Sequence, residues 1–200
     1  MKRLKIEELL RDASLFEKFC EDMQNASVAV IPTDTLYGFA VAANCEEAVE
    51  KVYRIKNRSG SKPLILFVHD VAELARLGFR ADTETIETLK KHWPGALTGI
   101  LAAPSQPAIK AFTFEKIGVR MPDHEPLRQL LGRLPFKLLT TSANRSGDPS
   151  DRNPDLIAAE FAAEIDWLLD GGILPEAMAS TVADFTVIPP VVLRQGKIKL

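Results

Sequence analysis

The sequence contains few cysteines, little net charge and no long apolar run. Its two cysteines, Cys20 and Cys45, form no CxxC pair and are too few for a disulfide framework, which predicts a protein of a reducing compartment. No segment reaches the roughly 18 consecutive apolar residues of a membrane span, and no apolar stretch of a signal peptide follows the basic N-terminus. We therefore expect a cytoplasmic protein with no membrane contact.

The near-neutral charge also limits the partners. A formal net charge of -2 and a pI near 6 argue against a wholly basic surface for nucleic acid, so any RNA contact would be weak and local. Hydrophobic residues make up 46% of the 200 residues, which is enough for one sizeable core, and the two halves do not differ in composition. We expect a single domain over residues 1–200.

Familiar catalytic and nucleotide motifs are missing. The three histidines, at positions 69, 92 and 124, have no metal-ligand spacing, and we assign no metal to protein side chains. GxSxG, GxxxxGK[ST] and GxGxxG are absent, so an ATP site would need neither a P-loop nor a dinucleotide fingerprint.

Helical and strand patterns interleave along the chain. The segment Ser14-Leu15-Phe16-Glu17 has the form of a capping box, and Asn44 with Glu47 predicts a second helix start. Further helices are expected over residues 70–78, 85–92 and 125–131, and strands over 28–31, 64–68, 98–102, 117–121, 137–140, 166–170, 180–184 and 191–194. The alternation favours an α/β fold with a twisted, open, mixed sheet and flanking helices.

Two polar clusters are candidates for a ligand site. Pro32 to Gly38 begins where an apolar strand ends, and the cations Lys56, Arg58 and Lys62 follow some twenty residues on. Such cations suit phosphate, and Arg58 can bind two oxygens at once, although a solvated helix end would look the same. The segment 140–147 forms the second cluster, and we expect the two clusters to meet in the fold.

The second cluster lies at the exit of a predicted strand. Ser142, Asn144, Ser146 and Ser150 offer short donors and acceptors there, where ligands sit in open α/β sheets. Plain turn chemistry is the alternative. The segment 145–153 is rich in Ser, Pro, Gly and Asp and is a candidate mobile lid or rim.

Arg120 stands inside an apolar strand and must find an anion or a carbonyl. A substrate carboxylate and a structural Asp or Glu would satisfy it equally well.

At these positions the chain resembles the YrdC-like threonylcarbamoyl-AMP synthases, which make the activated intermediate for N6-threonylcarbamoyladenosine in tRNA. The resemblance runs from about Val28 to Arg194. It rests on a KxR pair, Lys56 and Arg58, and an SxN pair, Ser142 and Asn144. Supporting matches are Pro32 to Gly38, Lys62-Pro63, Val119 to Pro122, Ser180 to Val182 and Leu193-Arg194.

The resemblance implies a YrdC-like fold around a positively lined cavity. It also implies a nucleotidyltransferase that joins L-threonine, bicarbonate and ATP to give threonylcarbamoyl-AMP and pyrophosphate, with Mg2+ on the phosphates of ATP. Because the chain ends soon after Arg194, we expect the short, single-domain form, which works with separate proteins that transfer the threonylcarbamoyl group to tRNA.

The same resemblance implies roles for individual residues. Lys56 and Arg58 would be catalytic, and Lys56 would lend charge to the nucleotide wall. The nucleotide would be held by Arg58, Lys62, Ser142, Asn144, Ser150 and Arg194. Threonine would be held by Thr35, Arg120, Ser180 and the backbone at Thr140. Some family members carry a histidine where this chain has Phe67, so a polar contact from that position is lost here.

Two alternatives remain. The chain could be a YrdC-like paralogue with a different substrate, because a fold alone does not define a substrate. It could also be a non-catalytic RNA-binding module with a phosphate-contacting stripe formed by Lys51, Arg54, Lys56, Arg58 and Lys62. Tyr53 is the one aromatic residue interleaved with that stripe, which gives base stacking little support.

Overall fold

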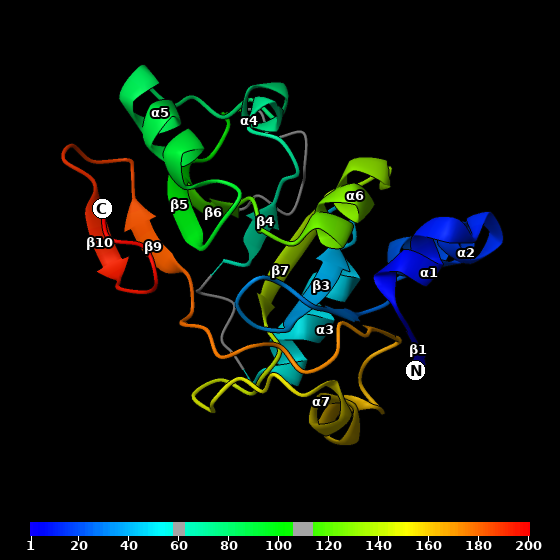
Figure 1. The fold of residues 1–200 in the computed structure, drawn as a ribbon. Helices are drawn as coiled ribbons and strands as arrows, with labels where there is room; N and C mark the ends of the chain where they lie inside the picture. The colour runs from blue at the N-terminus through cyan, green and yellow to red at the C-terminus, as the bar shows by residue number, and fades with distance from the viewer. Residues whose placement is uncertain (58–62, 106–113) are drawn as a thin grey trace.

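The protein is organised around one mixed sheet, seen in a computed structural model that describes residues 1–57, 63–105 and 114–200 (Figure 1). In these parts of the chain ten strands form the order β1-β8-β2-β3-β7-β4-β6-β5-β9-β10. The strands are β1 (Lys2–Leu4), β2 (Ala29–Ile31), β3 (Gly38–Ala42), β4 (Ile65–Phe67), β5 (Leu97–Ala102), β6 (Lys116–Arg120), β7 (Leu138–Ser142), β8 (Trp167–Leu169), β9 (Thr181–Asp184) and β10 (Val191–Arg194).

Helices pack on both faces of this sheet. They are α1 (Ile6–Arg11), α2 (Ala13–Gln24), α3 (Glu46–Ile55), α4 (Ala72–Arg76), α5 (Thr83–His92), α6 (Glu125–Arg133) and α7 (Pro154–Phe161). Strand β2 pairs with β8 in parallel and with β3 in antiparallel orientation, and β4 pairs in parallel with β6 and antiparallel with β7. The predicted α/β fold with a mixed open sheet is therefore confirmed.

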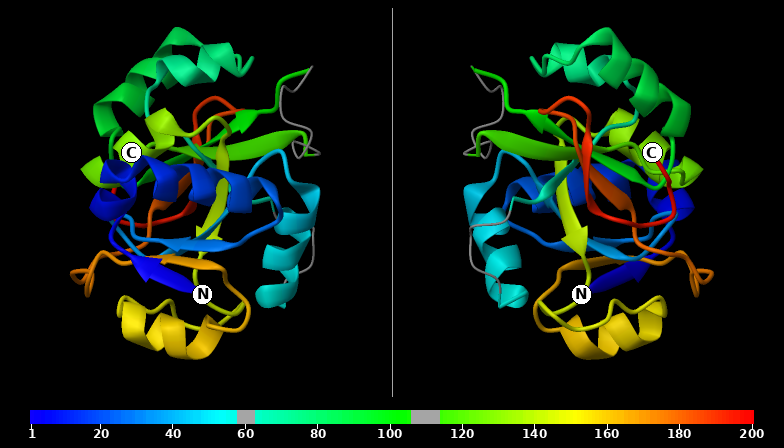
Figure 2. Two further views of the ribbon diagram at one scale, coloured as in Figure 1. Left: turned by 90° about the vertical axis from the view of Figure 1, so that its right-hand side faces the viewer. Right: turned by 90° about the vertical axis from the view of Figure 1, so that its left-hand side faces the viewer.

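Alternating side chains of the strands pack into two hydrophobic cores, one on each face of the sheet. Along β2, Val30 belongs to one core, and Ala29 and Ile31 belong to the other. Helices α1, α2 and α6 cover one core, while α3, α5 and α7 cover the other. Figure 2 shows α1 and α2 on the side of the molecule away from α3. Because β2 is buried on both faces, its sequence is continuously apolar.

Two helix starts differ from the prediction. Helix α2 begins at Ala13, where the Asp12 side chain accepts a hydrogen bond from the Leu15 amide at 3.0 Å, so the capping box predicted at Ser14 was wrong. The start predicted at Asn44 was also wrong, because α3 follows Cys45, which makes no side-chain capping bond. Both positions contain the right residue types, but the chain enters the helix one or two residues away.

Four elements were not predicted, namely β1, α1, β3 and α7. Strand β3 has the largest consequence, since it pairs with β7 in antiparallel register and places Gly38 opposite Ser142. A Cβ at Gly38 would lie 3.0 Å from the Thr141 carbonyl oxygen, so glycine permits this close approach. The Ala143 amide then donates to the Tyr37 carbonyl at 2.9 Å. The pairing brings the two polar clusters of the sequence together.

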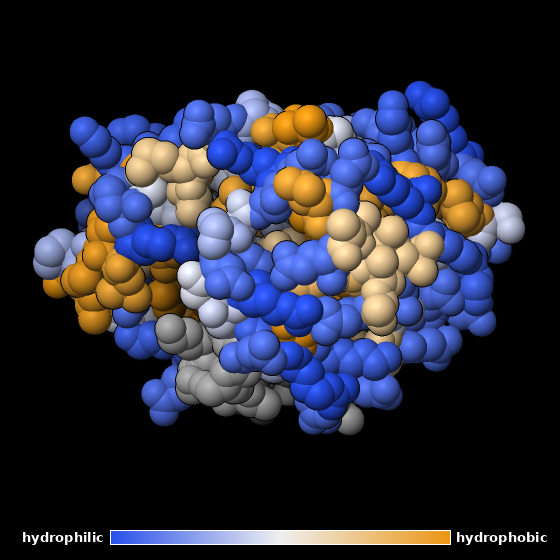
Figure 3. Space-filling view, turned by 90° about the horizontal axis from the view of Figure 1, so that it is seen from below, coloured by the Kyte–Doolittle hydropathy of each residue, from blue (hydrophilic) through white to orange (hydrophobic). Residues whose placement is uncertain are grey.

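The sheet ends in an exposed apolar edge. Hydrophobic side chains gather at the left of Figure 3, the side on which β9 and β10 lie in Figure 1. Ile188, Val191 and Leu193 are among the exposed large hydrophobic residues. Within the described ranges, no helix is long and apolar enough to span a membrane. The single-domain organisation stays a prediction.

Candidate active site

A cavity of about 1320 Å³ opens between the strands and the two polar loops. Strands β3, β4, β5, β6, β7, β9 and β10 contribute to its wall, together with the loop after β2, the end of α3 and the loop after β7. Among the described residues, its charged lining side chains are Lys56, Lys116, Arg120, Arg194, Glu115 and Asp184. Cations outnumber carboxylates, so the described lining carries net positive charge.

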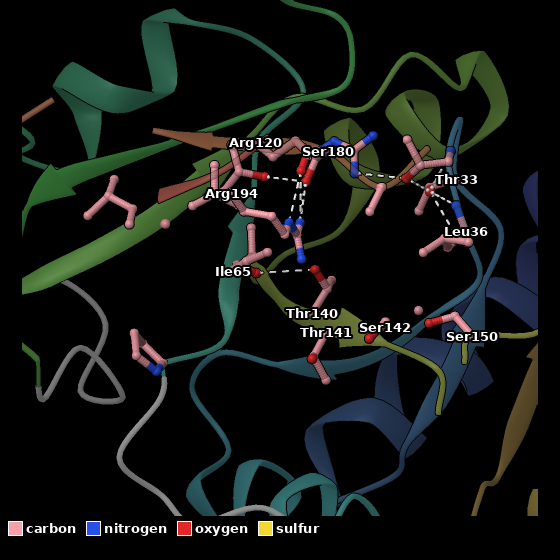
Figure 4. A pocket seen from close by; sticks show the side chains of 18 of the residues that line it. Thr33, Leu36, Ile65, Arg120, Thr140, Thr141, Ser142, Ser150, Ser180 and Arg194 are labelled. Carbon is pink, nitrogen blue, oxygen red and sulfur yellow. Dashed lines mark hydrogen bonds between the residues drawn. The ribbon is translucent and has the colours of Figure 1, made fainter. Parts of the chain in front are cut away.

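The structure brings the predicted site residues together at this cavity (Figure 4). In Figure 4, Ser180 and Arg194 lie on one side, Ser142 and Ser150 on another, and Thr140 between them. The lining includes Thr35, Lys56, Phe67, Arg120, Thr140, Ser142, Asn144, Ser150, Ser180 and Arg194. The predicted residues Arg58 and Lys62 lie outside the described residues.

Lys56 joins the end of α3 to the loop after β7. Its Nζ lies 2.6 Å from the Ser142 carbonyl oxygen, 2.8 Å from the Asn144 carbonyl oxygen and 3.0 Å from Asn144 Oδ1. An ammonium group has three N–H donors, and these three oxygens can accept all of them. The residue is only 3% exposed. Lys56 therefore places a positive charge at the cavity, while its N–H donors fix the loop after β7 through Ser142 and Asn144.

The SxN residues complete that wall. Ser142 Oγ donates to Asn144 Oδ1 at 2.6 Å, and Asn144 Nδ2 donates to the Asp148 carbonyl oxygen at 2.5 Å. The Ser146 amide donates to the Lys56 carbonyl oxygen at 2.9 Å. These bonds attach the first half of the loop predicted as a lid or rim to the end of α3. Ser146 and Ser150 line the cavity from this loop, which therefore forms part of its rim.

The partner of Arg120 is a carboxylate of the protein. Arg120 Nη2 lies 2.6 Å from Asp34 Oδ1, and Nη1 donates to Thr35 Oγ1 at 3.0 Å. Nε donates to the Gly95 carbonyl oxygen at 3.1 Å. Burial lowers the pKa of the Arg120 guanidinium, and the Asp34 carboxylate opposes that shift. Of the two partners left open by the sequence, a structural Asp is present, and Arg120 still faces the cavity.

Thr33 shapes the loop that carries Thr35. Its Oγ1 accepts hydrogen bonds from the Thr35 and Leu36 amides, each at 3.1 Å, and donates to the Leu36 carbonyl oxygen at 2.7 Å. This local network is typical of a threonine-stabilised turn. The turn directs Thr35 Oγ1 toward Arg120. The hydroxyl-rich loop is thus a rigid support for the guanidinium.

Arg194 holds Ser180 at the opposite side. Arg194 Nε and Nη2 donate to the Ser180 carbonyl oxygen at 3.1 and 2.9 Å. Burial lowers the pKa of the Arg194 guanidinium. Nearby, Lys116 Nζ lies 2.8 Å from Asp184 Oδ2. Burial raises the pKa of Asp184, but hydrogen bonds from Lys116 and Thr186 outweigh it and leave that pKa below its ordinary value.

Sequence reasoning missed several residues of this wall. Asp34 lay inside a quoted motif without a role, and the unpaired charge of Arg120 was the signal that such a carboxylate was needed. Lys116 and Asp184 gave no signal, since each could be an ordinary surface residue. Thr98 stood in a predicted strand, where a β-branched residue is expected in any case. Its hydroxyl, however, faces Ser180 in the cavity.

Comparison with known proteins places the chain in a family. A model of the Sua5/YciO/YrdC family, described as "Telomere recombination", matches residues 21–196. The chain is 32% identical over 179 residues to the threonylcarbamoyl-AMP synthase of Pyrococcus abyssi, a match covering 89% of this chain and 53% of that protein. It is 35% identical over 202 residues to the putative threonylcarbamoyl-AMP synthase of Methanocaldococcus jannaschii, covering 100% and 95%. The chain belongs to the Sua5/YciO/YrdC family.

A solved structure agrees with this result. The crystal structure of P. abyssi Sua5 complexed with L-threonine matches with a TM-score of 0.82 and 30% identity, over 92% of this chain and 55% of that one. The chain spans about half the length of several curated relatives that it matches. The family resemblance predicted from the KxR and SxN pairs is confirmed.

Proposed function

We propose that this chain is an L-threonylcarbamoyladenylate synthase, a nucleotidyltransferase. It forms threonylcarbamoyl-AMP and pyrophosphate from L-threonine, bicarbonate and ATP, and separate proteins then transfer the threonylcarbamoyl group to tRNA. The observation that carries the proposal is the common cavity of Lys56, Asn144, Arg120 and Ser180. Relatives named threonylcarbamoyl-AMP synthase in archaea, bacteria and eukaryotes support it.

The size of the cavity supports two substrates. Pockets for a single drug-sized ligand have volumes of about 300–1,000 Å³, and this cavity has about 1320 Å³. We assign the wall with Thr35, Arg120, Thr140 and Ser180 to threonine. We assign Arg194, Ser142, Asn144 and Ser150 to the nucleotide, with the charge of Lys56 behind them. Arg58 and Lys62 stay nucleotide ligands proposed from the sequence.

The chemistry requires charge stabilisation more than a protein nucleophile. The amine of threonine attacks the carbon of bicarbonate, water leaves, and a carbamate forms. A carbamate oxygen then attacks the α-phosphorus of ATP, and the bond from that phosphorus to pyrophosphate breaks. Negative charge moves onto the leaving oxygens, which fixed cations such as Arg194 stabilise. Threonine is held beside the α-phosphate by the wall with Ser180, which Arg194 contacts directly.

Magnesium fits this cavity as a companion of ATP. Mg2+ prefers oxygen ligands and keeps several waters, and in such sites the substrate phosphates hold it with one or two carboxylates. The cavity offers hydroxyl oxygens and, among the described residues, the carboxylates of Glu115 and Asp184, the latter paired with Lys116. Within the described ranges, no group of three or more His, Cys, Asp or Glu side chains could hold a metal ion. Bound magnesium would neutralise charge on the leaving pyrophosphate.

The RNA-binding alternative receives less support. Lys51 Nζ donates to the Ala26 carbonyl oxygen at 2.9 Å and lies 3.8 Å from Glu47. Arg54 lies 3.9 Å from Glu50 on the same helix. Carboxylates therefore alternate with the cations of the described part of this stripe, which weakens it as a surface for phosphates.

Product formation tests the proposal directly. The purified chain is incubated with ATP, Mg2+, L-threonine and 13C-labelled bicarbonate, and the products are analysed by mass spectrometry. We expect labelled threonylcarbamoyl-AMP with one pyrophosphate per product, and none when threonine is omitted. Product from another amino acid but not from threonine would identify a paralogue with a different substrate. No adenylate, together with tight and salt-sensitive RNA binding, would instead identify an RNA-binding module.

A further inference from the structure

A buried threonine lies behind the serine of the proposed amino-acid wall. Thr98 on β5 is 1% exposed and its Oγ1 lies 3.0 Å from Ser180 Oγ, although the two are 82 positions apart in sequence. Both residues line the cavity. We propose that Thr98 is a positioning residue that orients the Ser180 hydroxyl toward an acceptor oxygen of the amino-acid substrate. This inference rests on the proposed function.

A count of protons supports the role. Each hydroxyl supplies one proton and can accept two hydrogen bonds. The bond between Thr98 and Ser180 uses one of the two protons. Arg194 Nη2 donates to Ser180 Oγ at 3.1 Å and so occupies a lone pair and no proton. Among the described residues no acceptor takes the second proton. Because buried donors are almost always paired, this proton is free to bond an oxygen in the cavity, and the proposal assigns it to the ligand.

The geometry of the bond allows either hydroxyl to donate, and the proposed role requires that Thr98 donates to Ser180. When Thr98 donates to Ser180, the Oγ of Ser180 accepts from both Thr98 and Arg194, and both of its lone pairs are filled. Its own proton then has to point away from both partners, into the cavity. A carboxylate is the strongest acceptor available on a free amino acid. We therefore place the carboxylate of threonine at Ser180.

The neighbours of Thr98 restrict its rotation. A Cβ built on Gly118 would lie 3.3 Å from Thr98 Cγ2, so the methyl group of Thr98 packs closely over this glycine of the adjacent strand. With the methyl group against Gly118, the hydroxyl is directed at Ser180. Thr98 thus has two separable features, a methyl group that packs against Gly118 and a hydroxyl group that bonds Ser180.

These two features allow a test with opposite outcomes. Thr98→Val keeps the shape and removes the hydroxyl, whereas Thr98→Ser keeps the hydroxyl and removes the methyl. If Thr98 acts only by packing, valine will preserve threonine binding and serine will impair it. If the hydroxyl positions Ser180, the order is reversed. Thr98→Ala is the second hydroxyl-free variant, matched to Thr98→Ser, in case Thr98→Val does not fold.

The measurement is the Kd of L-threonine for the full chain by titration calorimetry, with KM values for threonine and ATP from the product assay. We expect Thr98→Val to weaken threonine binding about tenfold relative to the wild type. Thr98→Ala should weaken it about tenfold relative to Thr98→Ser. We expect Thr98→Ser to stay within about threefold of the wild type, and the KM for ATP to change less than that for threonine. In a Ser180→Ala background, Thr98→Val should add little, because its effect passes through Ser180.

The outcomes separate this inference from the proposed function. If the wild type forms threonylcarbamoyl-AMP while the hydroxyl-free variants bind threonine as tightly as Thr98→Ser, the positioning role is overturned and the function stands. If the wild type neither binds threonine nor forms the product, the function fails, and the assignment of Thr98 fails with it.

Discussion

Replacing Arg120 by leucine is expected to lower the free energy of unfolding by about 3–5 kcal/mol, the cost of removing one partner of a buried ion pair. Arg120 and Asp34 are 6% and 13% exposed at their side chains, so water would solvate the remaining carboxylate poorly. The kcat/KM for threonylcarbamoyl-AMP formation should fall by about 100-fold or more, because a fixed cation is lost from the amino-acid wall. Urea unfolding and steady-state kinetics measure the two effects.

A substitution of Asp34, the ion-pair partner of Arg120, provides the control. Asp34→Asn, added to Arg120→Leu, removes the unpaired charge and should restore part of the lost stability without restoring activity. A double-mutant cycle compares this step with Asp34→Asn in the wild-type background, where it should destabilise. Equal effects of Asp34→Asn in both backgrounds would mean that the two side chains are not coupled. Arg120 would then need another explanation for its position.

Replacing Lys56 by methionine should produce the second large effect. Methionine keeps the apolar stem but leaves two carbonyl oxygens and Asn144 Oδ1 without the ammonium donors. Because each buried unsatisfied group costs about 1–3 kcal/mol and the loop can relax, we expect a loss of about 3 kcal/mol in the free energy of unfolding. We also expect kcat/KM to fall by about 100-fold, since the nucleotide wall loses its charge and its shape.

A surface lysine provides the matched control for this substitution. Lys90 lies on α5 with its side chain 53% exposed and pairs with Glu87 at 3.0 Å. Lys90→Met should change the free energy of unfolding by less than about 1 kcal/mol, as is typical of an exposed ion pair, and should leave kcat/KM near the wild-type value. If Lys56→Met behaved like Lys90→Met in both measurements, the hydrogen bonds of Lys56 to Ser142 and Asn144 would not contribute to stability or activity.

The sequence predicted the meeting of the two polar clusters better than it predicted their contacts. The order of apolar runs was sufficient for an α/β sheet, and polar residues at strand ends tend to meet at one edge. Lys56 of the KxR pair does meet the SxN pair, since it contacts Asn144, which lies 88 positions further along the chain. However, two of the three Lys56 bonds go to main-chain oxygens. Such bonds depend on the path of a loop, which side-chain patterns do not specify.

The sequence also did not predict which side chains far apart in the chain contact each other. Arg120 could have faced a substrate or a protein carboxylate, and only the placement of Asp34, 86 residues away, decides between them. Thr98 resembled any β-branched strand residue until the pairing of β5 with β9 placed it beside Ser180. Strand β3 was missed because its short apolar run directly follows a motif that was interpreted as a ligand loop. Each of these features is set by sheet register, a tertiary property.

The most direct measurement of the central claim is a crystal structure of the chain with L-threonine and a non-hydrolysable ATP analogue bound together. We predict that both ligands occupy the cavity between β7 and β9, with threonine against Ser180 and Arg120 and the phosphates against Arg194. The amine of threonine should face the α-phosphate, with room for one carboxyl group between them. Ligands bound at separate surfaces, or a cavity that admits the nucleotide and excludes threonine, would contradict the account.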